Sequence, residues 1–83
     1  MIEIKIYSKP YCHLCDEMKI VLENVRKDHE FELIEINIET DESLFEKYKE
    51  LIPLLFVNGK KFAKYRIDKN KLLAKLYRES KTT

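Results

Sequence analysis

The 83-residue sequence has few cysteines, prolines and glycines: two, two and one, respectively. With only Cys12 and Cys15 available, a four-cysteine zinc site and a disulfide network are both excluded. No apolar run approaches the ~18 residues that a transmembrane helix needs. The N-terminus alternates like a strand and lacks the features of a signal peptide. We therefore expect a cytoplasmic protein with no membrane partner.

Charge of one sign is not in excess either, because 16 Lys and Arg face 15 Asp and Glu, a net charge of +1. This balance argues against a nucleic-acid partner, although bases and aromatic residues alternate over 60–66. The lysines in this stretch have another explanation, because lysines on an edge strand prevent sheet-to-sheet aggregation. The charge is polarised, however: residues 1–40 have nine acids and five bases, whereas residues 41–83 have six acids and eleven bases. Such a molecule can orient a charged partner, and an acidic one suits the basic half.

The first half of the chain predicts a βαβ unit. Alternating isoleucines predict a half-buried strand over 2–7, and a second alternating strand follows over 31–38. Between them, apolar residues at helical spacing predict a helix over 13–28. Two strands that flank one helix are expected to be parallel, with a right-handed crossover.

The second half predicts a helix, a hairpin and a final helix. Thr40 or Asp41 can cap a helix over 41–50, and Pro53 ends that segment before a buried strand over 54–57. Asn58-Gly59 is a strong hairpin signal and leads to a strand over 60–64. A last helix over 68–79 begins at Asp68. The inward face of the helix over 41–50 is expected to consist of Leu44, Phe45, Tyr48 and Leu51. That of the last helix is expected to consist of Leu72, Leu73, Leu76 and Tyr77. One domain is expected over 1–80, with 81–83 as a frayed tail.

Both cysteines lie where the first strand passes into the first helix. Cys12 is expected at the mouth of that helix and Cys15 about one turn inside it. The first N–H groups of a helix lack intrahelical acceptors and carry partial positive charge, so they stabilise a thiolate at Cys12 and lower its pKa. The acidic Asp16 and Glu17 oppose that effect. The pattern favours thiol–disulfide exchange, in which Cys12 attacks a disulfide and Cys15 resolves the mixed disulfide.

A closely spaced cysteine pair also occurs in zinc sites and in haem attachment. His13 and His29 would complete a Cys₂His₂ set, but His13 lies between the cysteines, so one tetrahedral ion could hardly collect all four. Haem attachment requires histidine after the second cysteine, where this chain has Asp16. A metal or iron–sulfur cluster held by the cysteines of two chains, an inert buried pair, and a non-catalytic adaptor that binds an acidic partner stay open as alternatives.

The segment 9–15, KPYCHLC, resembles the active-site segment of glutaredoxins, which belong to the thioredoxin-fold superfamily. Its ending, Leu14-Cys15-Asp16, is similar to a group of small glutaredoxin-like proteins with a Cys-X-Leu-Cys-Asp/Glu segment. The resemblance implies the minimal α/β thioredoxin fold, β-α-β-α-β-β-α, with a four-stranded mixed sheet of order 2-1-3-4 whose third strand is antiparallel to the first. The first and last helices would cover one face of the sheet and the second helix the other. The implied activity is a dithiol oxidoreductase that reduces protein or glutathione-mixed disulfides.

The same resemblance implies further site residues. Lys9 matches a lysine near the thiolate and the glutathione carboxylate, although it can also be a plain solvated lysine. A cis Ile52–Pro53 bond would leave the Ile52 backbone unpaired, so a substrate chain could pair with it as an added strand. We expect Tyr11 to be a partly exposed aromatic wall for substrate, with plain packing as the alternative. We expect His13 to be neutral at pH 7 and to modulate the redox potential.

The chain departs from glutathione-using glutaredoxins before the last helix. Asp68 matches their acid at the helix start, but the paired glycines that precede it are replaced by Tyr65, Arg66 and Ile67. The departure argues against glutathione as the reductant and makes a thioredoxin-reductase-type enzyme the alternative. We expect a monomer without a tightly bound cofactor, whose substrates are disulfide-containing proteins.

Overall fold

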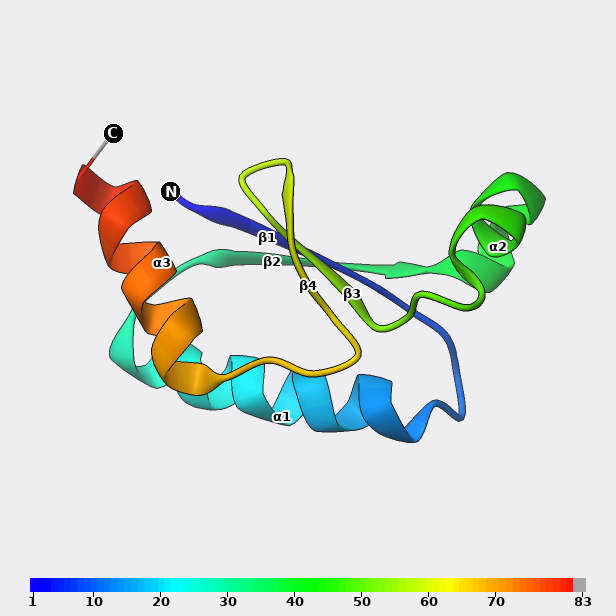
Figure 1. The fold of residues 1–83 in the computed structure, drawn as a ribbon, viewed down its shortest axis with the longest axis horizontal. Helices are drawn as coiled ribbons and strands as arrows, with labels where there is room; N and C mark the ends of the chain where they lie inside the picture. Colours follow the sequence, from blue (N-terminus) through cyan, green and yellow to red (C-terminus); the bar gives the residue numbers. More distant parts are fainter. Residues whose placement is uncertain (82–83) are drawn as a thin grey trace.

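The computed structural model describes residues 1–81 and contains the predicted order of helices and strands (Figure 1). Along the chain these are β1 (Glu3–Ser8), α1 (His13–Asp28), β2 (Glu32–Asn37), a 3₁₀ turn η1 (Ile38–Thr40), α2 (Glu42–Tyr48), β3 (Leu54–Val57), β4 (Lys60–Lys64) and α3 (Lys69–Lys81). The sheet order is β2-β1-β3-β4. β1 is parallel to β2, and β3 is antiparallel to both β1 and β4. The predicted sheet order and strand directions are confirmed.

Short polar side chains set the ends of several elements. β2 stops at Asn37, one residue before the predicted end, because the Asn37 side chain accepts the Glu39 N–H at 2.9 Å and starts η1. Asp41, rather than Thr40, caps α2 by accepting the N–H of Ser43 at 2.8 Å. α3 continues to Lys81, beyond its predicted end at residue 79. The rest of the predicted tail, 82–83, lies outside the described residues.

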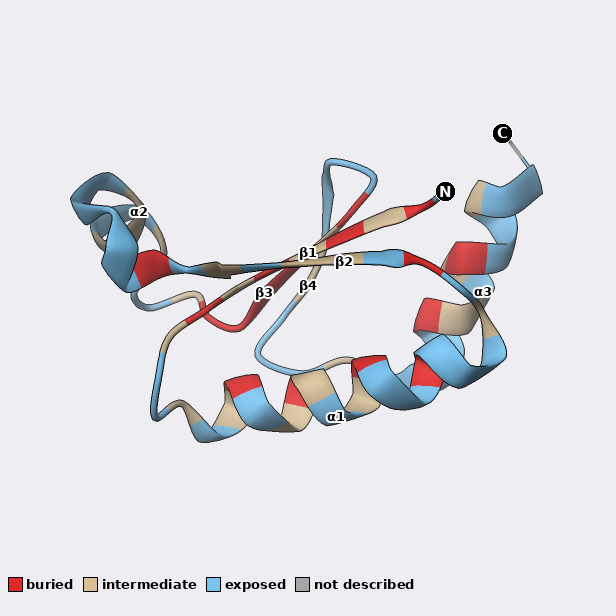
Figure 2. Ribbon diagram, turned by 180° about the vertical axis from the view of Figure 1, so that it is seen from behind, coloured by how far each residue is buried: buried red, intermediate tan, exposed pale blue. Residues whose placement is uncertain are grey.

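The main core fills the space between the sheet and the two helices α1 and α3. Most of its members are at most 2% exposed; these are Ile4, Ile6, Leu55 and Val57 from the sheet, Met18, Leu22 and Val25 from α1, Leu72 and Leu76 from α3, and Phe31. In Figure 2 the buried positions of α1 face the sheet. Burial of one such side chain stabilises a fold by ~1.5–3 kcal/mol. Because Ile4 and Ile6 alternate along β1, both lie on one face of the sheet, and their burial keeps α1 and α3 packed against that face.

The opposite face of the sheet meets α2 at one end only. Tyr7 points away from the main core, because it follows the buried Ile6 in the alternation of β1. Its ring centroid lies 4.6 Å from that of Tyr48 in α2 and 5.5 Å from that of Phe56 in β3. The three helices are thus divided between the faces as predicted (Figure 1).

One predicted core residue is not in the core. Tyr77 of α3 is 54% exposed, and its ring packs edge-on against His29 at a centroid distance of 5.1 Å. The inward stripe of α3 consists of Leu72, Leu73 and Leu76, and position 77 lies about 100° around the helix from 76. His29, in the loop after α1, is half-buried, with Nε2 2.9 Å from Ser80 Oγ.

The hairpin turn has the predicted conformation. Asn58 and Gly59 both have positive φ, 49° and 82°, which is the requirement of the turn that joins β3 and β4. Asn58 also contacts β1, because its Oδ1 accepts the Glu3 N–H at 2.9 Å, and its Nδ2 donates to Glu79 of α3 at 3.3 Å. The turn therefore connects the sheet to the end of α3.

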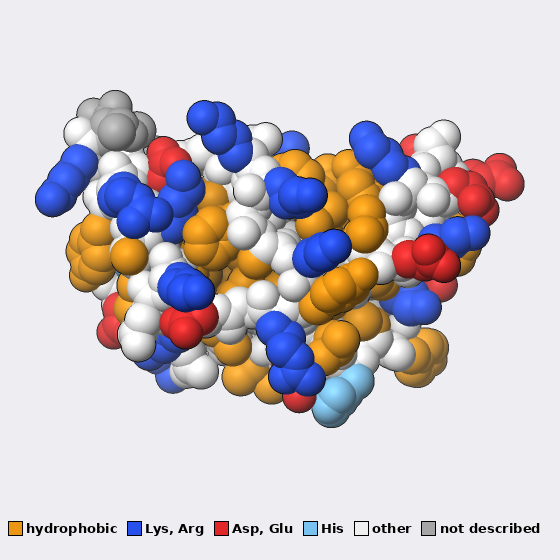
Figure 3. Space-filling model, in the orientation of Figure 1, with side chains coloured by type: hydrophobic (Ala, Val, Ile, Leu, Met, Phe, Trp, Pro, Cys, Tyr) orange, Lys and Arg blue, Asp and Glu red, His pale blue; other side chains and the backbone are white. Residues whose placement is uncertain are grey.

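The polarised charge of the sequence has a visible counterpart on the surface. On the face shown in Figure 3, lysine and arginine side chains gather over β4, the loop after it and α3, with few acidic side chains among them. None of the helices within residues 1–81 combines the length and apolar character that crossing a bilayer requires.

Candidate active site

Cys12 occupies the N-cap of α1, as the sequence predicts. Its backbone is extended, with φ −109° and ψ 107°, and its sulfur accepts the backbone N–H of Cys15 at 3.2 Å. The Cys12 carbonyl accepts the Asp16 N–H at 3.0 Å and so begins the helix. One of the unpaired N–H groups at the helix N-terminus is thereby directed at the Cys12 sulfur. That contact would favour the negative charge of a thiolate once the cysteine is reduced.

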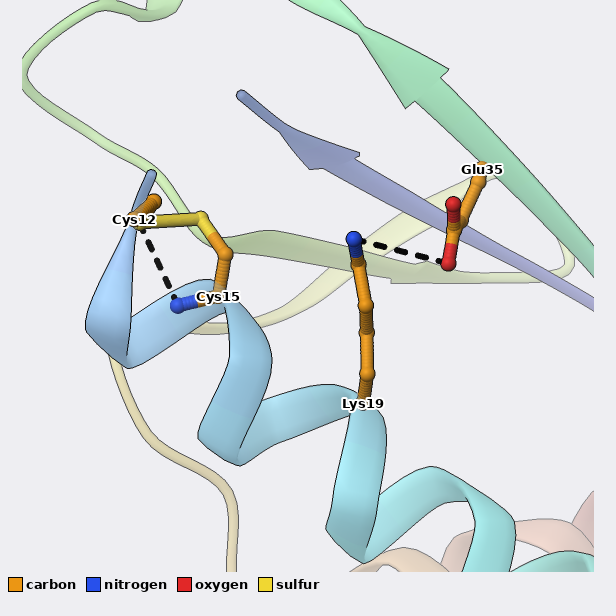
Figure 4. Close-up of a disulfide and its surroundings, with 4 residues drawn as sticks. All are labelled: Cys12, Cys15, Lys19 and Glu35. Atoms are coloured by element: carbon orange, nitrogen blue, oxygen red, sulfur yellow. Dashed lines mark hydrogen bonds and ion pairs between the residues drawn. A yellow bond between two sulfur atoms is a disulfide. The ribbon is translucent and has the colours of Figure 1, made fainter. Parts of the chain in front are cut away.

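The two cysteines form a disulfide and differ in exposure (Figure 4). Their Cα atoms are 5.2 Å apart, and Cys15 is completely buried. Cys12 is half-exposed. A molecule that arrives from solvent can therefore contact Cys12 but not Cys15. The predicted roles of an attacking Cys12 and a resolving Cys15 would require a difference of this kind.

Cys15 packs in a small cluster that also contains the predicted residue Ile52. The buried members are Cys15, Ile38 and Ile52, and partly buried side chains around them include Tyr7, Cys12 and Leu44. The Ile52–Pro53 bond is cis, as the resemblance implied, and both residues are buried. Within residues 1–81 the backbone N–H and carbonyl of Ile52 make no hydrogen bond. The structure thus brings Cys12, Cys15 and Ile52 together and leaves the Ile52 backbone unpaired.

Tyr65 is a residue whose contacts the sequence did not predict. It lies just after β4 with a positive φ of 69°, its N–H donates to the Pro53 carbonyl at 2.7 Å, and its hydroxyl donates to the Glu50 carbonyl at 2.7 Å. These bonds fasten the segment that contains the cis bond to the loop after β4. No sequence signal reveals them, because a tyrosine in the left-handed region is uncommon and depends on its tertiary contacts.

A second unpredicted residue, Glu17, connects the cysteine loop to the β4–α3 loop. Its carboxylate lies 3.3 Å from His13 Nε2 and 3.9 Å from Arg66 Nη1. The spacing of His13 and Glu17 on one helix is the only part of this arrangement that the sequence signals. Farther along α1, Lys19 extends toward the sheet and pairs with Glu35 of β2 at 3.6 Å (Figure 4).

The remaining predicted site residues are spread around the cysteines rather than gathered on them. Tyr11 is fully exposed instead of forming a partly exposed wall, because its φ of 59° directs the chain through a left-handed turn and the ring into solvent. His13 is also exposed. Lys9 is half-buried and lines a depression of about 260 Å³ with Asp16 and Glu35.

Asp68 acts as a helix cap. Its Oδ1 accepts the N–H of Asn70 at 2.8 Å and of Lys71 at 3.1 Å, which confirms its expected position at the start of the last helix. In the described part of the chain, no three His, Cys, Asp or Glu side chains converge on a point that could hold a metal ion.

Comparisons with known proteins agree with this geometry. Residues 3–77 match the family model of the glutaredoxin-like domain (DUF836). The glutaredoxin-like protein YDR286C homolog of Dictyostelium discoideum is 34% identical over 77 residues, which cover 86% of this chain and 71% of that protein. The solution structure of protein Ne2328 from Nitrosomonas europaea has a TM-score of 0.77 at 34% identity, and the match covers 90% of this chain and 91% of that one.

A more distant structure supports the fold alone. Thioredoxin-2 of the malaria parasite has a TM-score of 0.69 at 18% identity, over 94% of this chain and 82% of that one. The chain therefore has the thioredoxin fold, carries a Cys12–Cys15 pair at its characteristic strand–helix junction, and belongs to the glutaredoxin-like family.

Proposed function

We propose that this protein is a thiol–disulfide oxidoreductase that reduces protein disulfides or glutathione-mixed disulfides. The observation that supports it best is the Cys12 sulfur, which caps α1, accepts the Cys15 N–H and is reachable from solvent. Its disulfide partner Cys15 is completely buried. A pair with these properties has a preferred point of attack and a shielded resolving group.

The proposed reaction is a two-electron exchange that starts from the reduced dithiol. The Cys12 thiolate attacks one sulfur of the substrate disulfide, the substrate S–S bond breaks, and the leaving thiolate takes up a proton. The deprotonated sulfur of Cys15 then attacks Cys12 in the mixed disulfide, which releases the second substrate thiolate and forms the Cys12–Cys15 bond. The substrate gains two electrons and two protons, and the dithiol is oxidised.

The unpaired backbone of Ile52 is the group that we propose to hold a substrate chain. An extended segment next to the substrate disulfide could pair with its N–H and carbonyl, as in strand addition. The hydrogen bond from Tyr65 to Pro53 would keep that backbone in place. Lys9 and Tyr11 would contact the substrate from the cysteine loop, and His13 would modulate the pKa of Cys12.

The reductant that restores the dithiol is proposed to be an enzyme of the thioredoxin-reductase type, with glutathione as the alternative. Tyr65 and Arg66 occupy the segment that carries paired glycines in glutathione-using relatives, and both side chains are committed to contacts with Glu50 and Glu17. Asp68, the residue matched to a glutathione-binding acid, is engaged in capping α3. We further propose that the protein acts in the cytoplasm as a monomer without a tightly bound cofactor.

An equilibrium titration of the pair against glutathione redox buffers tests the proposal. The fraction of disulfide is read by alkylation of free thiols and mass spectrometry. A single reversible two-electron transition is expected, and its midpoint would show whether a cytosolic thiol pool keeps the pair reduced. Reduced protein should also reduce a disulfide-containing peptide in one turnover.

Two results would contradict the proposal. One is that the thiols never pair in any buffer, and the other is that they resist alkylation until a chelator removes a metal. The second result would favour a metal or iron–sulfur binding module that uses the same cysteines. Visible colour or zinc in freshly purified protein would point the same way.

A further inference from the structure

A basic depression lies between β4 and α3, apart from the cysteine pair. It has a volume of about 680 Å³, and its apolar lining comes from Phe62, Ala63, Ile67 and Ala74. Its charged lining consists of Arg66, Lys71, Arg78 and the single acid Asp68. We call this depression the β4–α3 groove. In Figure 3 the surface is hollowed between α3 and β4, and lysine and arginine side chains surround the hollow.

Of the three cations that line the groove, only Arg66 has an ionic partner, Glu17, within the described residues. Within residues 1–81, Lys71 and Arg78 form no ion pair, nor do Lys61 and Lys64 of the adjacent strand. Asp68 is the single acid of the lining, so the three lining cations leave the groove with an excess of positive charge. Surface cations elsewhere are often paired: Lys19 contacts Glu35, and Lys49 contacts Glu46. An acidic partner would therefore meet a field that the protein itself does not neutralise.

The shape of the neighbouring strand limits how a partner can bind. β4 is an edge strand, but its register with β3 shifts between Leu55 and Phe56. Three of its residues are exposed lysines: Lys60, Lys61 and Lys64. Bulges and lysines are the features that keep an edge strand from pairing with another strand. A partner is thus expected to contact the groove through side chains, with carboxylates on the cations and an apolar residue on the floor beside Phe62 and Ile67.

The groove reaches the cysteine loop at one end through charged contacts. Arg66, which lines the groove, lies 3.9 Å from Glu17, and Glu17 lies 3.3 Å from His13. His13 directly follows the exposed cysteine in the chain. A partner seated in the groove would therefore adjoin the surface from which Cys12 is reached.

We propose that the β4–α3 groove is a docking site for an acidic, amphipathic segment of the protein whose disulfide is exchanged at Cys12. The proposal rests on the redox function proposed above and names the chemistry of the partner: aspartate and glutamate around one or two apolar side chains. Docking raises the rate of encounter, and the effect weakens as salt screens the charges.

Two matched peptides test the docking site. Both contain the same disulfide loop; one has a tail of Asp, Glu and Leu, and the other has the same tail with Asn and Gln in place of the acids. Pre-reduced protein is mixed with each peptide in excess, and the single-turnover rate constant is measured at low and high salt. The acidic peptide is expected to react about tenfold faster at low salt, with most of that advantage lost near 1 M salt.

Charge variants locate the effect. The double variant Lys71→Glu/Arg78→Glu should remove the advantage of the acidic peptide and leave the rate for the neutral peptide unchanged. The milder Lys71→Gln/Arg78→Gln should remove part of it. The control Lys47→Glu/Lys49→Glu makes the same change in net charge on α2, at the opposite end of the molecule (Figure 1), and should keep the advantage. All four positions are exposed, so the variants are expected to fold.

The outcomes separate the docking proposal from the redox proposal. Reduction of both peptides at equal rates, or an equal loss of advantage in the groove and control variants, would overturn docking and leave the redox function standing. Failure to reduce either peptide would overturn the redox function. Fluorescence anisotropy of the labelled peptides with oxidised protein measures docking separately, and no preference for the acidic tail would reject it. Displacement of that peptide by a tighter-binding 12-nucleotide oligothymidylate would also reject it, in favour of a nucleic-acid surface.

Discussion

The main core and the small cluster around Cys15 differ in how they are built. Within residues 1–81 the main core has eleven buried hydrophobic residues: nine from the sheet, α1 and α3, together with Ile2 before β1 and Phe31 between α1 and β2. The small cluster has three buried residues, Cys15, Ile38 and Ile52, and its surroundings are partly exposed. The fold thus concentrates its stabilising burial on one face of the sheet and places the reactive sulfur in a thinner, partly open cluster.

This difference suggests that stability and chemistry can be changed separately. The main core contains neither cysteine, so a substitution in it should change the stability of the oxidised and reduced forms alike. Residues of the Cys15 cluster surround a sulfur that changes from disulfide to thiol. The following variants test that separation, beginning with the largest expected effect.

Replacement of the cysteines should have the largest effect on activity. Cys12→Ser removes the exposed sulfur, so disulfide reduction is expected to fall to the uncatalysed rate. Cys15→Ser keeps the first attack and removes the resolving step, and should therefore accumulate a mixed disulfide with the substrate. Mass spectrometry of the quenched reaction distinguishes the two. A mixed disulfide on Cys15 in the Cys12→Ser protein would reverse the assigned roles.

Truncation in the two clusters should separate stability from redox potential. Leu22→Ala in the main core is expected to lower the free energy of unfolding by ~2–5 kcal/mol without moving the redox midpoint. Ile38→Ala should destabilise the fold similarly and also shift the midpoint to less negative values, on the order of 10–30 mV, because water then reaches the Cys15 thiol. Urea unfolding and glutathione titration measure the two quantities. Equal midpoints in both variants would show that the clusters do not differ in this respect.

Removal of the Tyr65 hydroxyl should have a moderate effect. Tyr65→Phe loses the hydrogen bond to the Glu50 carbonyl and is expected to cost ~0.5–1.5 kcal/mol of unfolding free energy. Because the backbone bond from Tyr65 to Pro53 remains, the redox midpoint should stay close to that of the unaltered protein. Loss of substrate reduction without loss of stability would instead indicate that the ring itself contacts the substrate.

The smallest effect is expected at Glu79, far from the cysteines. Hydrogen bonds from Lys75 and then from Asn58 hold the pKa of Glu79 below its ordinary value near 4.5. A lowered pKa in the folded state means that the carboxylate stabilises the fold above pH 4.5, and that this contribution is lost as the pH falls through the folded-state pKa. Urea midpoints of the unaltered protein and Glu79→Gln should therefore differ at pH 7 and converge in acid. A difference that persists at pH 2–3 would contradict this reading.

Much of the fold could be predicted because its signals are local. The bounds of α1 and of the strands at 54–57 and 60–64 match the periodicity and the Asn58-Gly59 turn. Asp41 and Asp68 cap helices where their side chains predict it. Tyr77 could not be placed in the same way, because helical spacing gives a stripe of candidates and only the packing against α1 decides which of them is buried.

The candidate site likewise combines local features, which the sequence predicts, with contacts between distant segments, which it does not predict. The sequence by itself determined that Cys12 stands at a helix N-terminus with Cys15 one turn inside, because three residues of spacing and a strand–helix junction are short-range features. The bonds from Tyr65 to residues 50 and 53 and the Arg66–Glu17 contact were decided only by the tertiary structure. Each depends on where segments distant in the chain come to lie, and no local pattern encodes that arrangement. The basic groove is of the same kind, since its lining residues come from β4, a loop and α3, and only the packing of these segments brings them together.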